Sequence, residues 1–135
     1  MPSSRLLLDT NVLLASLLSP DRLPKTTQTI LTDPNHTILF SAVSLWEIAI
    51  KSSLRRPDFD FEPQDIYQLA QETGFTELPM ESIHTFLLAS LPWHHKDPFD
   101  RLLVAQAVTL PSRLLTTDAA LVPYSPLVDC ISWES

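Results

Sequence analysis

Glycine, cysteine and basic residues are scarce in this sequence. The single glycine, Gly74, cannot supply the pattern of a Rossmann fingerprint or of a P-loop, which excludes both of these phosphate-binding motifs. The single cysteine, Cys130, excludes an internal disulfide framework and a thiolate-rich zinc site. Lys and Arg number 9 against 16 Asp and Glu, and the resulting formal charge of −7 repels nucleic acid over most of the surface. A polyanionic ligand would therefore need a local basic site or a metal ion.

Long hydrophobic runs are also missing. The uncharged stretches 36–46 and 102–112 fall short of the roughly 18 residues that a membrane span needs. The apolar segment 6–18 is interrupted by Asp9, and no signal-peptide cleavage site follows it. We therefore expect a cytoplasmic protein without a membrane span. Its 135 residues predict one domain, residues 1–135, because domains commonly hold ~100–200 residues.

Short apolar runs alternate with longer segments of helical periodicity. Runs that are continuously apolar are typical of strands covered on both faces, and they occur at 6–8, 38–40 and 114–115, with weaker candidates at 75–78 and 128–131. Helical spacing predicts helices over residues 44–54, 64–72, 81–91 and 98–109. This alternation predicts an α/β fold in which helices flank a mostly parallel sheet of four or five strands.

Acidic residues from four regions of the chain fall near one edge of that sheet. Asp9 and Asp118 each follow a predicted strand, and ligand crevices in open α/β sheets lie outside the carboxyl ends of strands. Glu47 lies in the first predicted turn of the helix after the second strand. Asp97 and Asp100 open the helix before the 114–115 strand. We expect these side chains to converge.

Each acid also has a structural explanation. Ser44 and Glu47 have capping-box spacing, and Asp97 before Pro98 is typical of a helix N-cap followed by proline at the first helical position. Asp9 and Asp118 can cap helices too. For each acid taken alone, capping is the favoured interpretation.

Capping does not explain why so many acids gather. Clustered carboxylates repel one another unless a hard cation such as Mg²⁺ lies between them. Such a cation makes a bound water more acidic and polarises a phosphoryl oxygen. The set therefore indicates a hydrolase that acts on phosphate esters.

Four segments, in this order, resemble the PIN-domain ribonucleases of the VapC toxin type: Leu6–Val12, Ser41–Lys51, His94–Arg101 and Leu114–Asp118. The resemblance extends over essentially the whole chain. It implies a three-layer PIN fold and endonucleolytic cleavage of RNA that depends on Mg²⁺ or Mn²⁺ and leaves 5′-phosphate and 3′-hydroxyl ends. It also implies a cognate antitoxin whose tail covers the acidic site, and a homodimer.

The same resemblance assigns roles to individual residues. It implies that the catalytic, metal-binding carboxylates are Asp9, Glu47, Asp100 and Asp118, with Asp97 as an auxiliary metal-binding acid. Asn11 and Thr116 would be supporting polar residues. Candidate RNA contacts are the basic residues Lys51, Arg55, Lys96 and Arg101. Lys51 has a simpler alternative, an ion pair with Glu47 one helical turn earlier.

Other side chains suggest weaker hypotheses. His94 and His95 are adjacent and therefore do not face the same way, and no further His or Cys completes a zinc site. Trp46 and Trp93 could stack on bases, but apolar packing is the favoured role. Cys130 is expected to be a buried, inert thiol in a strand.

Two other functions compete with the nuclease. An aspartyl phosphatase also begins with a strand and an aspartate, but Asn11 stands where its second aspartate is needed. A non-catalytic, PIN-like binding module would keep the acidic pocket without turnover.

Overall fold

The computed structural model describes residues 4–54 and 60–134. Its sheet has five strands in the order β3-β2-β1-β4-β5, and all four neighbouring pairs are parallel. The strands are β1 (Ser4–Leu8), β2 (His36–Ser41), β3 (Thr76–Leu78), β4 (Arg113–Thr116) and β5 (Val128–Cys130). The predicted α/β class and the predicted parallel sheet are confirmed.

The central strand β1 explains why the first apolar run has no alternation. Leu6, Leu7 and Leu8 are all fully buried, and they pair with β2 on one side and β4 on the other. Leu6 and Leu8 pack into one hydrophobic cluster while Leu7 packs into the other, so both faces of the strand are covered. From β1 the chain builds outward to β2 and β3, then returns to add β4 and β5 on the other side. The carboxyl ends of β1 and β4 therefore flank a topological switch point, where ligands bind in such sheets.

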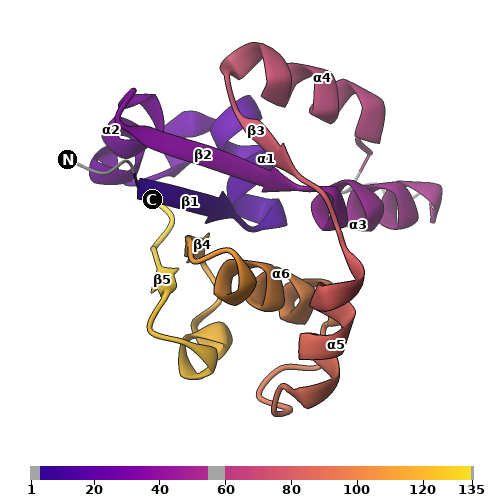
Figure 1. The fold of residues 1–135 in the computed structure, drawn as a ribbon. Helices are drawn as coiled ribbons and strands as arrows, with labels where there is room; N and C mark the ends of the chain where they lie inside the picture. The colour runs from indigo at the N-terminus through magenta and orange to yellow at the C-terminus, as the bar shows by residue number, and fades with distance from the viewer. Residues whose placement is uncertain (1–3, 55–59, 135) are drawn as a thin grey trace.

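Helices cover the two faces of the sheet in separate layers (Figure 1). One face packs against α1 (Thr10–Leu18), α2 (Lys25–Thr32) and α4 (Pro63–Thr73). The other packs against α5 (Ser82–Ser90) and α6 (Pro98–Thr109). Helix α3 (Ala42–Ser53) contributes Ile48 to the first cluster and Val43 to the second. The three-layer arrangement matches the prediction.

Helices α1 and α2 both lie outside the four segments for which helical spacing predicted a helix. A helix after Asp9 was expected only from the capping role of that residue, whereas nothing in the sequence indicated α2. Its eight residues, KTTQTILT, include three β-branched threonines before any apolar residue, so neither propensity nor periodicity marks it as a helix. Two short 3₁₀ helices, η1 (Pro20–Arg22) and η2 (Ala119–Tyr124), complete the described elements. Within the described residues, no helix has the length and apolar character needed to cross a membrane.

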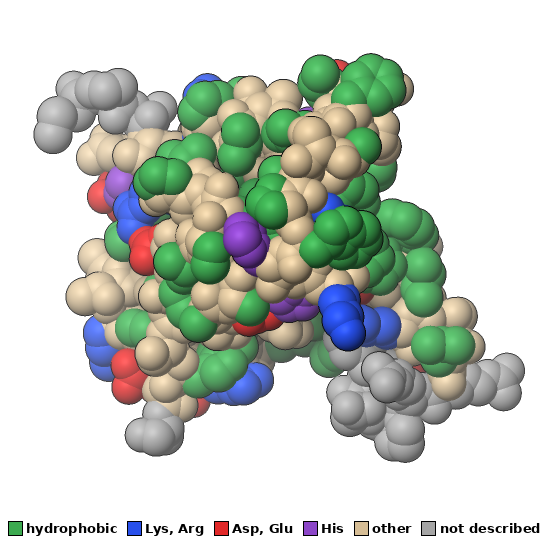
Figure 2. All heavy atoms as spheres, turned by 90° about the horizontal axis from the view of Figure 1, so that it is seen from below, with side chains coloured by type: hydrophobic (Ala, Val, Ile, Leu, Met, Phe, Trp, Pro, Cys, Tyr) green, Lys and Arg blue, Asp and Glu red, His purple; other side chains and the backbone are tan. Residues whose placement is uncertain are grey.

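The two tryptophans are largely on the surface: Trp93 is 76 % exposed and Trp46 is 47 % exposed. Trp46 still packs against Phe99, with 4.8 Å between ring centroids, as predicted. The predicted burial of Cys130 is wrong. Cys130 does lie in a strand, as predicted, but β5 is a short edge strand and its thiol is exposed. Figure 2 shows many hydrophobic side chains on one face of the molecule, where Lys and Arg are scattered and form no continuous patch.

Candidate active site

Five predicted acids come together at the carboxyl edge of the sheet. Asp9 follows β1 directly, Asp118 follows β4, Glu47 lies on α3, and Asp97 and Asp100 open α6. The charges of Asp97, Asp9 and Glu47 all raise the pKa of Asp100, and the charges of Glu47 and Asp118 raise the pKa of Asp9. The carboxylates are thus close enough to repel one another, as the strand positions predict.

Asp9 is buried and fixed by local hydrogen bonds. It is the N-cap of α1, and its Oδ1 accepts from the backbone N–H of Val12 at 2.8 Å. Its side chain also forms a hydrogen bond with Thr116. Burial raises the pKa of Asp9 to about 6, and the neighbouring charges add to this rise while the two hydrogen bonds oppose it. The predicted capping role is confirmed, and it coexists with a place in the acidic cluster.

Glu47 is buried with donors on both of its oxygens. Its Oε1 accepts from the hydroxyl of Thr10 at 2.6 Å, and its Oε2 pairs with the Lys51 ammonium at 2.5 Å. The hydroxyl of Ser44 lies 2.9 Å from that of Thr10, which extends the polar chain. The predicted Glu47–Lys51 ion pair is therefore present.

The capping box predicted for Ser44 and Glu47 is wrong. Helix α3 begins two residues earlier than expected, at Ala42, and its N-cap is Ser41, whose hydroxyl accepts from the backbone N–H of Val43 at 2.9 Å. Glu47 consequently lies in the second turn, where it meets Thr10 of α1 instead of its own helix terminus. Its position is set by tertiary contacts.

Asp97 and Asp100 behave differently although both open α6. Asp97 is the N-cap, with Pro98 next, and its Oδ1 accepts from the backbone N–H of Phe99 at 2.8 Å. Burial raises the pKa of Asp100 to about 7, with further contributions from the charges of Asp97, Asp9 and Glu47, while His95 opposes the rise. Asp97 therefore has a structural role that Asp100 lacks.

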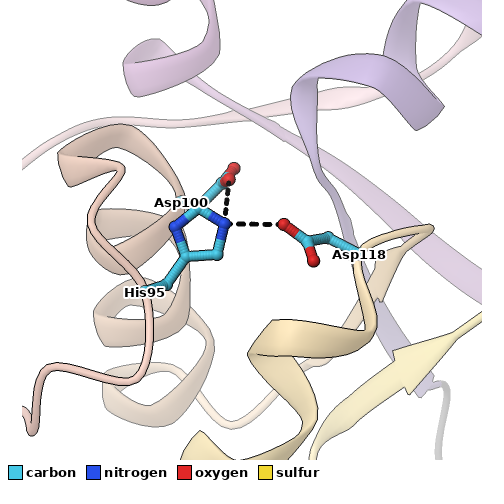
Figure 3. A group of neighbouring side chains, drawn as sticks. All are labelled: His95, Asp100 and Asp118. Atoms are coloured by element: carbon cyan, nitrogen blue, oxygen red, sulfur yellow. Dashed lines mark hydrogen bonds and ion pairs between the residues drawn. The ribbon is translucent and has the colours of Figure 1, made fainter.

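His95 is a site residue that the sequence reasoning missed. Its Nε2 lies 2.7 Å from Asp118 Oδ2 and 3.7 Å from Asp100 Oδ2 (Figure 3). His94 points elsewhere and its ring contacts that of Tyr124, with 4.9 Å between centroids. The two histidines face different ways, as expected, but one of them joins the acids. The sequence feature that could have indicated His95 as a site residue is its place two residues before Asp97.

The predicted supporting and basic residues lie in varied surroundings. Thr116 is fully buried beside Asp9, its hydroxyl also accepting the backbone N–H of Asp118 at 3.0 Å. Asn11 is exposed and lines a groove along α1. Lys96 is exposed next to Asp97. Arg55 lies outside the described residues.

The prediction that Arg101 contacts RNA is wrong. Its side chain is buried, and Nη2 donates to the carbonyl of Leu91 at 2.9 Å, at the carboxyl end of α5. Its guanidinium also lies 3.9 Å from the centroid of the Trp93 ring. The residue joins α5 to α6 and does not present its charge to a ligand.

The donor set suits a hard divalent cation. Asp9, Glu47, Asp100 and Asp118 offer carboxylate oxygens, which Mg²⁺ and Mn²⁺ prefer. Burial and mutual repulsion raise the pKa of Asp9 to about 6 and that of Asp100 to about 7, and a cation between them would offset both effects. The residues therefore fit the ion that the sequence predicted.

A family model described as "PIN domain" matches residues 6–123, which span every predicted site residue. The chain belongs to the PIN domain family. The PIN-domain membership that the sequence resemblance implied is confirmed, and PIN domains are generally nucleases. No curated protein matches the sequence.

Solved structures share the fold of this PIN domain at low sequence identity. A chain of VapBC2 from Rickettsia felis, crystallised with a DNA fragment from the promoter, superposes with a TM-score of 0.69 and 17 % identity, covering 96 % of this chain and 99 % of that one. FitAcB from Neisseria gonorrhoeae gives 0.51 and 18 %, covering 85 % and 88 %. A domain from Methanocaldococcus jannaschii gives 0.55 and 17 %, covering 87 % and 80 %.

Proposed function

We propose that this PIN domain is a metal-dependent endoribonuclease, the toxin of a toxin–antitoxin pair, that hydrolyses RNA phosphodiester bonds. The observation that supports this function is the convergence of Asp9, Glu47, Asp100 and Asp118, from four separate elements, at the switch point of a PIN fold. A purely structural set of helix caps would not need to bring buried carboxylates within repulsive range of one another.

The four carboxylates would hold Mg²⁺ or Mn²⁺. When bound, the ion makes a water more acidic and polarises a phosphoryl oxygen. The rest of the site fixes the ligands: Val12 N–H and Thr116 hold Asp9, while Thr10 and Lys51 hold Glu47. Asp97 keeps its Oδ1 on the start of α6 and so positions Asp100. Because these ligands are held before an ion arrives, little ordering remains to be done on binding.

RNA would be held by a small number of local contacts, since the net charge is −7. Lys96 is exposed beside the acidic cluster and is the favoured phosphate contact. Lys51, which forms an ion pair with Glu47, is the second candidate for a phosphate contact. The exposed rings of Trp46 and Trp93 offer faces on which unpaired bases could stack.

Two protein partners belong to the proposal, an antitoxin and a second copy of this chain. VapBC2 and FitAcB, whose fold this chain shares, support the antitoxin. A groove of about 340 Å³ along α1 begins at Asn11, two residues after Asp9, and could receive an antitoxin tail; its lining includes Leu14, Leu18, Phe61 and Trp133. We propose that this chain and its antitoxin bind each other in the cytoplasm.

The direct test is cleavage of a mixed panel of structured and unstructured RNAs by the purified protein, free of antitoxin, with Mg²⁺ or Mn²⁺. Products should appear with metal and be absent with EDTA. They should also be absent with Asp9→Asn, a matched control because asparagine caps a helix as well as aspartate does.

Full activity in Asp9→Asn, or products that persist in EDTA, would contradict the assignment. Confirmed metal binding without cleavage of any RNA, together with tight association with a partner protein, would favour the non-catalytic binding module.

A further inference from the structure

The ring of His95 is held on both of its nitrogens. Nδ1 faces the backbone N–H of Asp97 at 2.9 Å, and Nε2 faces Asp118 Oδ2 at 2.7 Å (Figure 3). The backbone of His95 is fixed as well, since its N–H donates to the hydroxyl of Tyr124 at 3.0 Å. The imidazole is therefore built into the edge of the acidic site, with only one fifth of its side chain exposed.

These contacts determine which nitrogen carries the proton. A backbone N–H can only donate, so Nδ1 must present a lone pair to Asp97. A neutral imidazole with a bare Nδ1 carries its hydrogen on Nε2. The contact with Asp118 is then an N–H of His95 donating to a carboxylate oxygen.

This tautomer is the wrong one for a metal ligand. Nε2 of His95 and carboxylate oxygens of Asp100 and Asp118 lie within 4.8 Å of one another, a spacing that a metal ion could bridge. A histidine that coordinates through Nε2, however, needs its lone pair there and carries the hydrogen on Nδ1, which then donates to an acceptor. Here Nδ1 meets a donor, so coordination would place two N–H groups against each other.

We propose that His95 is a positioning residue that stays out of the metal's coordination shell: its Nε2–H fixes the carboxylate of Asp118. This inference rests on the proposed function and deepens it. Asp118 needs such support because it lies beyond the end of β4 and its side chain is 40 % exposed. Its Oδ1 already accepts from the backbone N–H of Ala120 at 2.9 Å. With His95 on Oδ2, both oxygens are oriented, and each keeps a lone pair for a cation.

The first experiment measures the ring nitrogens of the metal-free protein. ¹⁵N chemical shifts of labelled histidine distinguish a protonated from a bare nitrogen. We expect a bare Nδ1 and a protonated Nε2 for His95, with a cross-peak from Nε2–H that is lost in Asp118→Ala. A protonated Nδ1 with a bare Nε2 would overturn the proposal. This measurement needs neither metal nor RNA, so it succeeds or fails independently of the nuclease assignment.

The second experiment uses Mn²⁺ as a probe of the loaded protein. Pulsed EPR detects a nitrogen bound directly to Mn²⁺, and we expect no such coupling from ¹⁵N-histidine. A directly coordinated histidine nitrogen would overturn the proposal while leaving the nuclease function intact. Failure of the parent protein to bind Mn²⁺ at all would count against the proposed function, whereas the ring tautomer would still test the hydrogen bond.

Two substitutions of His95 distinguish the role of Nε2 from that of Nδ1. His95→Gln places an amide N–H near the position of Nε2 and can still donate to Asp118, whereas His95→Asn reaches only the position of Nδ1. We expect Mn²⁺ affinity close to the parent in His95→Gln and lowered roughly 10-fold in His95→Asn, the size of effect typical of residues that orient ligands. Equal losses in both folded variants would contradict the proposal.

Discussion

Two halves of the acidic site are stabilised in different ways. The inner pair, Asp9 and Glu47, is almost fully buried, and its oxygens meet donors from the protein itself: Val12 N–H, Thr116, Thr10 and Lys51. The outer trio, His95, Asp100 and Asp118, is partly exposed, and its two carboxylates lie near a single imidazole N–H. Although Asp9 is the more buried acid, the pKa rises to about 7 in Asp100 and only to about 6 in Asp9.

This difference indicates which carboxylates a bound cation would stabilise most. Hydrogen bonds oppose the effect of burial on Asp9, whereas the influence that opposes it on Asp100 comes from His95. The inner pair is therefore largely satisfied by the fold, and the outer trio has the larger unmet demand for positive charge. Four experiments test this difference between the inner pair and the rest of the site.

The largest effect is expected for Asp100→Asn. Loss of a metal-binding carboxylate should lower RNA cleavage by about a thousandfold, which corresponds to ~4 kcal/mol of transition-state stabilisation. The same substitution removes a repelled, partly buried charge, so the metal-free protein at pH 8 should become more stable by about 1–3 kcal/mol. RNA cleavage assays and urea unfolding in EDTA measure the two effects. Reduced stability in EDTA would show that Asp100 is satisfied without a cation.

The pH dependence of metal-free stability is the second test. The folded state holds protons on Asp9 and Asp100 more tightly than the unfolded chain, whose carboxyls titrate near 3.8. The free energy of unfolding contributed by these groups is therefore fully present below about pH 4, declines as pH rises to about 7, and is level above that. About 1–3 kcal/mol of this decline should disappear in Asp100→Asn, as urea unfolding at several pH values would show. Parallel profiles for parent and variant would contradict the raised pKa.

The inner pair is tested by Thr10→Val. Valine keeps the shape of threonine but removes the hydroxyl that donates to Glu47, leaving a buried carboxylate oxygen short of a donor. We expect a loss of about 1–3 kcal/mol in the free energy of unfolding. Thr10→Ser is the matched control because it keeps the donor and should lose less. A valine variant as stable as the serine variant would show that Lys51 alone satisfies Glu47.

The smallest effect is expected for Lys96→Ala, at an exposed residue next to Asp97. Loss of one exposed phosphate contact should weaken RNA binding only a few-fold and make it less sensitive to salt. Lys25→Ala is the control, since Lys25 is also exposed but belongs to α2, beside the amino ends of β1 and β2 (Figure 1). Binding of a fluorescent RNA in EDTA measures both variants. Equal losses would show that the two lysines act only through net charge.

Local sequence patterns predicted much of the fold of this protein. Continuous apolar runs predicted the three inner strands β1, β2 and β4, because a strand buried on both faces needs apolar residues at every position. The edge strands β3 and β5 were weaker candidates, since their short sequences TEL and VDC include acidic residues. Proline after Asp97 predicted the start of α6 correctly, since proline at the first helical position has no N–H to leave unpaired. The convergence of acids followed from strand ends meeting at one edge. That the described unit is the whole functional domain, residues 1–135, stays a prediction.

Spacing along a few residues was enough to predict the α/β class, the parallel strands and the edge where the acids meet. Tertiary structure alone decided the partners of those acids. Thr10 and Glu47 are 37 residues apart, and His95 and Asp118 are 23 apart. Arg101 looked like a surface cation, yet packing turned it into a buried link between two helices. Side-chain direction and helix start depend on how layers pack, and no local spacing records that.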